Sequence, residues 1–148
     1  MKKGKLIVFE GLDGSGKQTQ SALFFQRLKE QGAAVMKVSY PRYDNPSSSL
    51  VKMYLAGEFG QNPDEVSPYI SSTFFAVDRY ASYKQDYETF YSDGGIVIAD
   101  RYTTSNILHQ ASKIADIDER QRFLSWLTDL EYNMACLNQI WCFFWIWG

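Results

Sequence analysis

Cysteine, histidine and long hydrophobic segments are scarce in this chain, and each scarcity excludes a type of protein. Cys136, Cys142 and His109 are the only cysteines and histidine, and no CxxC pair or Cys/His cluster occurs. The sequence therefore argues against a structural zinc site and a disulfide framework, and a cytoplasmic location is expected. The apolar residues 140–147 are too few to cross a bilayer, because a spanning helix needs about 20 residues, so no membrane partner is expected.

A predominance of one charge sign is also absent. The chain of 148 residues carries 15 Lys and Arg against 17 Asp and Glu, and the two signs are interleaved. A protein that coats DNA or RNA carries a clustered basic footprint, so no nucleic acid polymer is expected as a partner. A small anionic ligand is compatible with this balance, because a few placed cations bind one phosphate. Hydrophobic residues make up 45%, which argues against disorder and for one packed domain over residues 1–148.

Short apolar runs alternate with longer helical patterns along the chain. The runs predict buried strands at residues 5–10, 35–40 and 96–99. The longer segments predict helices at residues 17–31, 50–56, 67–91, 103–115 and about 119–133, the last capped by Asp118. Leu23, Phe24 and Leu28 are expected near one face of the first of these helices, with Gly32 as its C-cap. Core packing is expected for the recurring aromatic residues Tyr80, Tyr83, Tyr87 and Phe90 or Tyr91, and an inward face for Phe123, Leu127 and Leu130. This alternation of strands and helices predicts an α/β fold with a parallel β-sheet flanked by helices. The carboxyl ends of parallel strands share one edge of the sheet, and ligands bind along that edge.

A glycine-rich segment follows the first predicted strand and precedes the first predicted helix. It fits the pattern G-x-x-x-x-G-K, in which backbone N–H groups surround a polyphosphate and the lysine reaches the β- and γ-phosphates. The start of the helix adds a positive end. The alternative is a glycine-rich turn without a ligand, but strand, loop, lysine and helix together favour phosphate. The residues predicted to bind the phosphates of ATP are Gly11, Leu12, Asp13, Gly14, Ser15, Gly16, Lys17, Gln18 and Thr19.

One position in this segment departs from the usual pattern. Ser or Thr normally follows the lysine and touches Mg²⁺ through its hydroxyl. Here Gln18 follows Lys17, and Thr19 comes next. The direct hydroxyl contact with the metal is therefore in doubt, whereas the phosphate site is not.

Three further groups of residues follow predicted strands or lie on a predicted helix. They are Tyr40-Pro41-Arg42-Tyr43, the pair Phe75 and Arg79 four residues apart, and Asp100-Arg101-Tyr102 with Asn106 and Gln110 beyond. Three arginines suit an anionic second substrate, because arginine binds phosphate bidentately. Each residue alone has an ordinary explanation, such as a surface arginine, a core phenylalanine or a structural ion pair. Their joint occurrence at these junctions favours a nucleotide site.

Four motifs together resemble the thymidylate kinase family. They are FEGLDGSGK (residues 9–17), YPRY (40–43), FFAVDR (74–79) and ADRYTTSNILHQ (99–110), and the resemblance covers roughly residues 5–133. It implies a three-layer P-loop NTPase fold and an enzyme that transfers the γ-phosphoryl group of MgATP to dTMP, giving dTDP for dTTP synthesis. Members commonly form homodimers, so a homodimer is one expected assembly. The alternatives are another P-loop (deoxy)nucleotide kinase or a non-catalytic nucleotide-binding remnant.

The resemblance also assigns roles to residues of this chain. The residues that it implies for dTMP binding are Asp13, Arg42, Phe75, Arg79, Arg101, Tyr102, Asn106 and Gln110. Among them, Arg42 and Arg101 would hold the phosphate, and Phe75 would stack on thymine. Tyr102 would lie where a ribose 2′-hydroxyl would go. The implied catalytic residues are Asp13, Lys17 and Arg101, and the implied Mg²⁺ site uses Asp13 and Asp100, partly through water.

Residues 134–148 form an atypical tail. Family members tend to have GLPKPDLVxFLDM here, a loop and a fourth strand, whereas this chain has LNQIWCFFWIW at residues 137–147. Synonymous codons for the printed residues exist that, read in another frame, encode PKPDLVFFLDM. This permits the hypothesis of a frameshift near Asn133, with the family fold truncated at the C-terminus. The alternative is a genuine apolar strand or an aromatic interaction patch.

On either interpretation the later family segments are missing from the printed chain, including the arginines of the LID segment and the adenine-binding loop. Family members with glycine at the position of Gly14 take their transition-state arginines from that LID segment. The resulting expectation is that the dTMP-site residues are largely present, and that turnover by the printed chain is weak or absent.

Overall fold

The computed structural model describes residues 4–62, 64–135 and 141–145. The chain divides into two compact units. Unit 1 comprises Met1–Tyr40, Ser82–Tyr102 and Leu137–Gly148, and unit 2 comprises Pro41–Ala81 and Thr103–Cys136. The expectation of one domain over residues 1–148 stays a prediction. Within the described ranges, no helix has both the length and the apolar character needed to cross a membrane.

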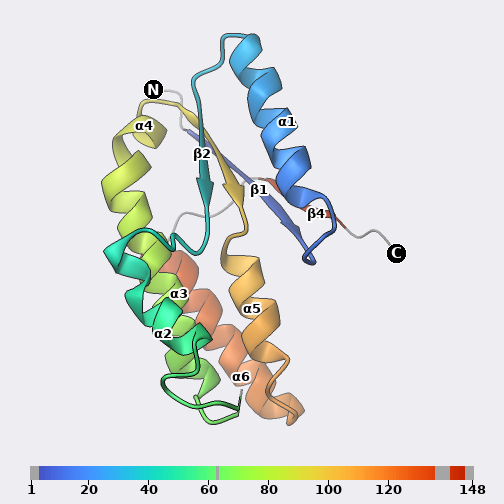
Figure 1. The fold of residues 1–148 in the computed structure, drawn as a ribbon, viewed down its shortest axis with the longest axis vertical. Coiled ribbons are helices and arrows are strands. Elements are labelled where there is room, and N and C mark those ends of the chain that lie inside the picture. Colours follow the sequence, from blue (N-terminus) through green and yellow to red (C-terminus); the bar gives the residue numbers. More distant parts are fainter. Residues whose placement is uncertain (1–3, 63, 136–140, 146–148) are drawn as a thin grey trace. The chain divides into compact units, whose positions relative to one another are not determined.

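Unit 1 is built on a parallel sheet of four strands, which confirms the predicted fold class (Figure 1). Their order is β2 (Val35–Ser39), β3 (Ile96–Asp100), β1 (Lys5–Gly11) and β4 (Trp141–Trp145). In this register Phe9 lies opposite Asp100 on one side and Phe143 on the other. Residues 141–145 of the tail therefore pair with β1, as the apolar-strand interpretation expected. The frameshift stays a hypothesis.

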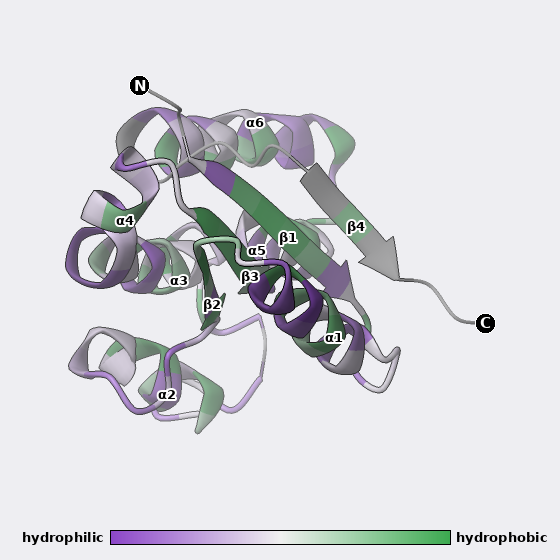
Figure 2. Ribbon diagram, turned by 90° about the horizontal axis from the view of Figure 1, so that it is seen from above, coloured by the Kyte–Doolittle hydropathy of each residue, from purple (hydrophilic) through white to green (hydrophobic). Residues whose placement is uncertain are grey.

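Helix α1 (Lys17–Glu30) covers one face of this sheet, as Figure 2 shows. Its side chains Phe24, Phe25 and Leu28 pack against a core of Ile7, Phe9 and Ile98. Leu23 was expected on the same face but is 59% exposed, because the packed face runs through its neighbours Phe24 and Phe25. The predicted end of the helix at Gly32 is confirmed by the bond from its N–H to the Lys29 carbonyl (3.0 Å).

The sequence predicted one helix over residues 67–91, but these residues do not form one regular α-helix. Three segments take its place: α3 (Pro68–Ser82), the π-helical turn Tyr83–Tyr87 and α4 (Glu88–Ser92). A π turn takes more residues than an α turn, so regular spacing no longer keeps side chains on one face. Tyr87 and Tyr91 are buried, whereas Tyr80 is 45% exposed. The prediction of core packing is confirmed for Tyr87 and Tyr91 and wrong for Tyr80.

Unit 2 is helical. Besides the first part of α3, it contains the 3₁₀ turn Pro46–Ser48, α2 (Ser49–Leu55), α5 (Thr103–Ala111), α6 (Ile117–Thr128) and the π-helical segment Asp129–Ala135. Phe123 and Leu127 of α6 are fully buried, and Leu130 packs against the same cluster, which confirms the predicted inward face. Tyr69 of α3 closes the cluster, with its ring centroid 5.1 Å from that of Phe123.

The start of α6 differs from the prediction. Asp116, and not Asp118, is the N-cap, because its extended backbone lets Oδ1 accept a hydrogen bond from the Glu119 N–H (2.8 Å). Asp118 already lies in the first turn. The capping-box spacing holds for Asp116 and Glu119, so the pattern was correctly recognised but placed two residues too late.

Candidate functional site

The glycine-rich loop of unit 1 connects β1 to α1. Gly14 and Gly16 adopt φ angles of 78° and 88°, in the left-handed region that L side chains rarely occupy. A Cβ added at either position would meet nothing within 4 Å. The two glycines are therefore required by the backbone conformation and not by lack of space. Gly16 is the N-cap of α1 without a side-chain cap, which leaves the helix N-terminus to a ligand or solvent.

Lys17 lies against this loop. Its side chain is mostly buried, and Nζ is 3.4 Å from the Leu12 carbonyl and 3.5 Å from Asp13 Oδ1. Both contacts are long for charged hydrogen bonds, so the ammonium group has weak partners. Ser15 Oγ is buried, and in the described part of the chain it has no hydrogen-bond partner. An anion in the loop would satisfy both groups.

Asp13 joins Lys17 to Arg101. Its Oδ1 accepts a hydrogen bond from Arg101 Nη2 and also faces Lys17 Nζ. The charge and hydrogen bond of Arg101, followed by those of Lys17, lower the pKa of Asp13 below its usual 3.8. The carboxylate, whose side chain is 93% exposed, is therefore ionised at neutral pH. The structure thus brings together the three side chains to which the resemblance gives catalytic roles.

The backbone at Arg101 is unusual. Its φ of 66° is the only positive value of a non-glycine residue among the described residues. The Arg101 N–H donates to the Phe9 carbonyl (3.0 Å), and the next N–H, that of Tyr102, donates to Glu10 Oε1 (2.8 Å). Both amides next to the strained conformation are thus tied to β1. Such strain persists only where the surroundings enforce it, and it is common at functional sites.

Tyr102 lies in a buried cluster of phenols in unit 1. Its ring centroid is 5.9 Å from that of Tyr40. Burial, followed by the neighbouring Tyr102 and Tyr40 groups, raises the pKa of Tyr87. Tyr102 is therefore a core residue of unit 1. Its role beside the sugar of a nucleotide stays a prediction.

The oxygen donors of unit 1 fit Mg²⁺. The described residues contain no group of three His, Cys, Asp or Glu side chains that would hold a metal ion alone. Mg²⁺ in phosphoryl-transfer sites commonly uses one or two carboxylates, with waters and substrate phosphates completing its shell. Asp13 at the loop and Asp100 at the end of β3 provide carboxylates of that kind. Gln18 and Thr19 are exposed in the first turn of α1.

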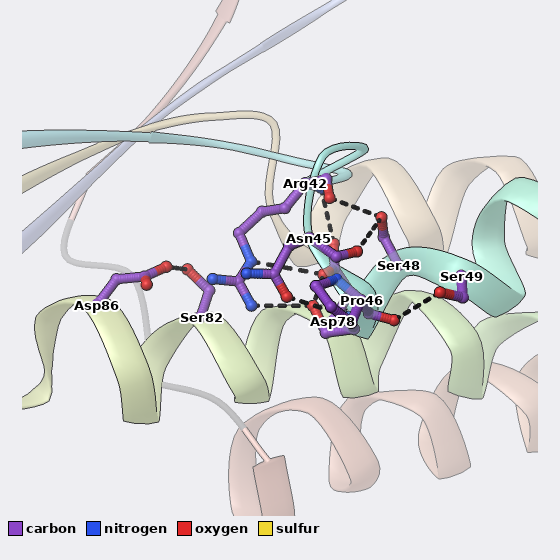
Figure 3. Close-up of polar contacts among 9 residues, drawn as sticks. Arg42, Asn45, Pro46, Ser48, Ser49, Asp78, Ser82 and Asp86 are labelled. Atoms are coloured by element: carbon purple, nitrogen blue, oxygen red, sulfur yellow. Dashed lines mark hydrogen bonds and ion pairs between the residues drawn. The ribbon is translucent and has the colours of Figure 1, made fainter.

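In unit 2, Arg42 is held by Asp78 and a serine (Figure 3). Arg42 Nε lies 3.5 Å from Asp78 Oδ1, Nη2 donates to Ser47 Oγ (2.9 Å), and the Arg42 backbone N–H donates to Asp78 Oδ2 (2.9 Å). Ser48 Oγ donates to the Arg42 carbonyl (2.6 Å). The turn after Tyr40 thus has a defined conformation, and Arg42 is an ion-paired residue in this structure.

Phe75 is half-buried on α3 and meets the edge of an aromatic neighbour. Its ring centroid is 6.2 Å from that of Tyr54, at an interplanar angle of 90°. Burial raises the pKa of the Tyr54 phenol, but the hydrogen bond and charge of Lys113, with smaller effects of Gln110 and Ser71, lower it overall. Gln110 is buried and accepts a hydrogen bond from Ser71 Oγ (2.8 Å). Phe75 and Gln110 therefore flank Tyr54, a residue that the sequence did not point to.

Arg79 is the most buried of the predicted arginines. It forms an ion pair with Glu131, in which Nη2 bonds Oε1 and Nε lies 3.3 Å from Oε2. Asn106 Nδ2 donates to the same carboxylate (3.0 Å) and to the Ser72 carbonyl (3.1 Å). The ordinary explanation of a helical arginine as a surface group is therefore wrong here. Unit 2 links Arg79 and Asn106, two residues predicted to bind dTMP, through the carboxylate of Glu131.

The family of the chain follows from its match to a family model. The family model described as thymidylate kinase matches residues 9–127. The chain belongs to the thymidylate kinase family. The match covers the glycine-rich loop, the Arg42 turn, α3 and the residues after β3.

Individual thymidylate kinases agree with this assignment. A probable thymidylate kinase of Pyrococcus horikoshii is 30% identical over 116 residues, covering 78% of this chain and 56% of that protein. The thymidylate kinase of Pelotomaculum thermopropionicum is 32% identical over 108 residues, covering 73% and 48%. That of Plasmodium falciparum is 29% identical over 113 residues, covering 76% and 51%. The chain thus spans about half the length of these relatives.

Two solved thymidylate kinase structures share the fold. The Candida albicans enzyme has a TM-score of 0.76 at 24% identity, covering 97% of this chain and 63% of that one. The Ehrlichia chaffeensis enzyme has a TM-score of 0.73 at 22% identity, covering 99% and 78%. These likenesses support the P-loop α/β fold.

Two acidic residues of this thymidylate kinase family member were missed by the sequence analysis. Glu10 is the last residue but one of β1 and is buried, and Glu131 lies in the π-helical segment and is fully buried. A signal existed for Glu131, because it follows Phe123 and Leu127 at four-residue steps in the sequence, where a regular helix would carry another apolar residue. Glu10 gave a weaker signal, because a strand end often carries a polar residue.

Proposed function

We propose that the protein transfers the γ-phosphoryl group of MgATP to dTMP, giving dTDP and ADP for the synthesis of dTTP. The observation that carries the proposal is the arrangement of Lys17, Asp13 and Arg101 beside the glycine loop of unit 1. Phosphoryl transfer needs positioned positive charge and little covalent chemistry. Lys17 and Arg101 supply positive charge of this kind, and the glycine loop supplies backbone N–H groups.

The loop acts on the phosphoryl donor. Backbone N–H groups of residues 11–17 and the uncapped start of α1 bind the phosphates, and Ser15 Oγ gains a partner. Lys17 Nζ turns from its weak contacts to the β- and γ-phosphates. Asp13 and Asp100 would hold Mg²⁺, partly through water, and the ion would neutralise phosphate charge when bound. Gly11, Leu12, Gly14, Gly16, Gln18 and Thr19 complete this phosphate-binding set.

A second set of residues binds the acceptor, dTMP. Arg42 and Arg101 bind its phosphate, and Asp13 contacts the 3′-hydroxyl of its sugar. Phe75 stacks on thymine, and Arg79, Asn106 and Gln110 contact the base, with Tyr102 excluding ribonucleotides. A phosphate oxygen of dTMP then attacks the γ-phosphorus in line, and the bond to the β–γ bridging oxygen breaks as ADP leaves. We place the enzyme in the cytoplasm, with a homodimer as its assembly.

The test is acceptor-dependent formation of ADP by the purified chain. Because turnover by the printed chain is expected to be weak, we expect dTMP to increase ADP release only slightly above the rate with ATP alone, and dCMP, UMP and thymidine to do so less. Lys17→Met should abolish the increase. Glu119→Gln, a change of an exposed side chain on α6, is the control.

Binding measured by calorimetry separates the alternatives. ATP and dTMP binding without any transfer would favour the non-catalytic remnant over an enzyme. Preferred transfer to thymidine or to another monophosphate would favour a different P-loop kinase. Failure to bind either nucleotide would overturn the proposal.

A further inference from the structure

The proposed mechanism gives no role to Glu131, a buried acid of unit 2. Glu131 is 0% exposed, and an apolar side chain at this position would be buried without the desolvation cost of a carboxylate. A buried carboxylate is tolerated only when hydrogen bonds and an opposite charge compensate its lost hydration.

Both oxygens of Glu131 are used. Oε2 faces Arg79 Nε at 3.3 Å, and Oε1 accepts from Arg79 Nη2 and from Asn106 Nδ2 at 3.0 Å. Two donors from one guanidinium hold the planar arginine side-on, so its orientation is defined as well as its position. The same carboxylate therefore orients a residue on α3 and one on α5.

The consequence for Asn106 is a fixed amide. Its Nδ2 group has two hydrogens, and its two acceptors are Glu131 Oε1 and the Ser72 carbonyl (3.1 Å). An amide turned the other way would place Oδ1 against two acceptors. In the described part of the chain Oδ1 is buried and has no hydrogen-bond partner, so the side chain offers a bare acceptor.

We infer that Glu131 is a positioning residue that sets base selectivity, by holding Asn106 as an acceptor and Arg79 as a donor. The inference rests on the proposed function. Thymine and uracil carry an N–H at N3 next to a carbonyl at C4, which matches an acceptor beside a donor. Cytosine carries a bare N3 next to an amino group. Its N3 acceptor would face the Asn106 acceptor, and its amino donor would face the Arg79 donor, so neither pair could form a hydrogen bond. Selection of the base thus depends on an acid that does not touch it.

The ordinary alternative is that Glu131 only compensates the buried charge of Arg79. In that case, loss of the Glu131 carboxylate weakens folding and lowers the affinity for every nucleotide by the same factor. The inference requires a different result, a change in the ratio of two ligands. The dissociation constants of dTMP and dCMP, measured by calorimetry, give that ratio without requiring turnover.

Glu131→Gln is the decisive variant, since the new amide can donate to Asn106 and let its side chain turn over. We expect the preference for dTMP over dCMP to fall by about tenfold or more, because reversing a buried donor or acceptor leaves groups unpaired. Glu131→Asp keeps the charge, and its preference for dTMP over dCMP should lie between those of Glu131→Gln and the unaltered chain. Glu119→Gln makes the same chemical change on an exposed side chain of α6 and should leave the ratio unchanged.

The outcomes separate the inference from the proposed function. An unchanged ratio in folded Glu131→Gln, with dTMP still bound by the unaltered chain, would overturn the inference and leave the function standing. If circular dichroism shows that Glu131→Gln does not fold, an unchanged ratio in Glu131→Asp would overturn it equally. Absence of dTMP binding by the unaltered chain would overturn both.

Discussion

The two units carry functional residues of different kinds. In unit 1 the glycine loop uses backbone groups and residues close in sequence, and Asp13, its acid, is 93% exposed. In unit 2 the polar residues come from distant segments, such as Arg79 and Glu131, and they are buried. The loop is thus specified by local conformation, whereas the unit 2 network exists only once its helices are packed. Substitutions should therefore affect unit 1 mainly through ligand binding and unit 2 mainly through stability.

The largest expected effect comes from breaking the buried pair. Glu131→Ala should lower the free energy of unfolding by about 3–5 kcal/mol, because it leaves Arg79 buried without its carboxylate. Asp13→Ala removes an exposed partner of Arg101 and should change it by less than about 1 kcal/mol. Urea unfolding followed by circular dichroism measures both. Equal losses in the two variants would remove the contrast between the units.

The next effect concerns the phosphate loop. Lys17→Met should lower kcat/KM for ATP roughly 100- to 1,000-fold, as the loss of one positioned charge typically does. Its unfolding free energy should change by less than about 1 kcal/mol, because Nζ has only long contacts in this structure. Steady-state kinetics and urea unfolding of the same preparation give both values. A stability loss as large as that of Glu131→Ala would show that the loop supports the fold as well.

A smaller effect tests the corrected helix start in unit 2. Asp116→Ala should cost about 1 kcal/mol of unfolding free energy, because the Glu119 N–H loses its acceptor. Asp118→Ala should cost within about 0.5 kcal/mol, as expected of an exposed residue in the first turn. Thermal unfolding of the two variants compares them directly. The reverse ranking would restore Asp118 as the cap.

The smallest effect is the titration of Asp13. Arg101 and then Lys17 lower its pKa below 3.8 in the folded chain, so the ionised group adds stability above that pH. This contribution is lost as the pH falls through the folded value. Carbon NMR of the Asp13 carboxyl should show a midpoint below 3.8 that moves up toward it in Arg101→Met. An unmoved midpoint would mean that the Arg101 contact does not persist in solution.

The elements with strong local patterns were predictable from the sequence. The apolar runs predicted β1, β2 and β3, and the glycines predicted the loop and the end of α1. The π-helical turn Tyr83–Tyr87 was not predictable, because its residues also suit a regular helix and a π turn carries no strong local preference. The same reason explains the misplaced Tyr80.

The candidate site divides in the same way. Arg42, Arg79 and Asn106 were named from their motifs, but their partners Asp78 and Glu131 were not. An ion pair between residues 52 positions apart leaves no spacing signal in one sequence. Predicting that Arg79 is buried required knowing which helix lies against it.

The sequence by itself determined the family, the parallel α/β fold and the phosphate loop of this protein. These depend on hydrophobic periodicity and on glycine conformations, which act over a few residues. Only the tertiary structure decided the strained backbone of Arg101, the acceptor orientation of Asn106 and the burial of Glu131. Those features depend on desolvation and on hydrogen bonds between distant segments, and both arise only when the chain has packed.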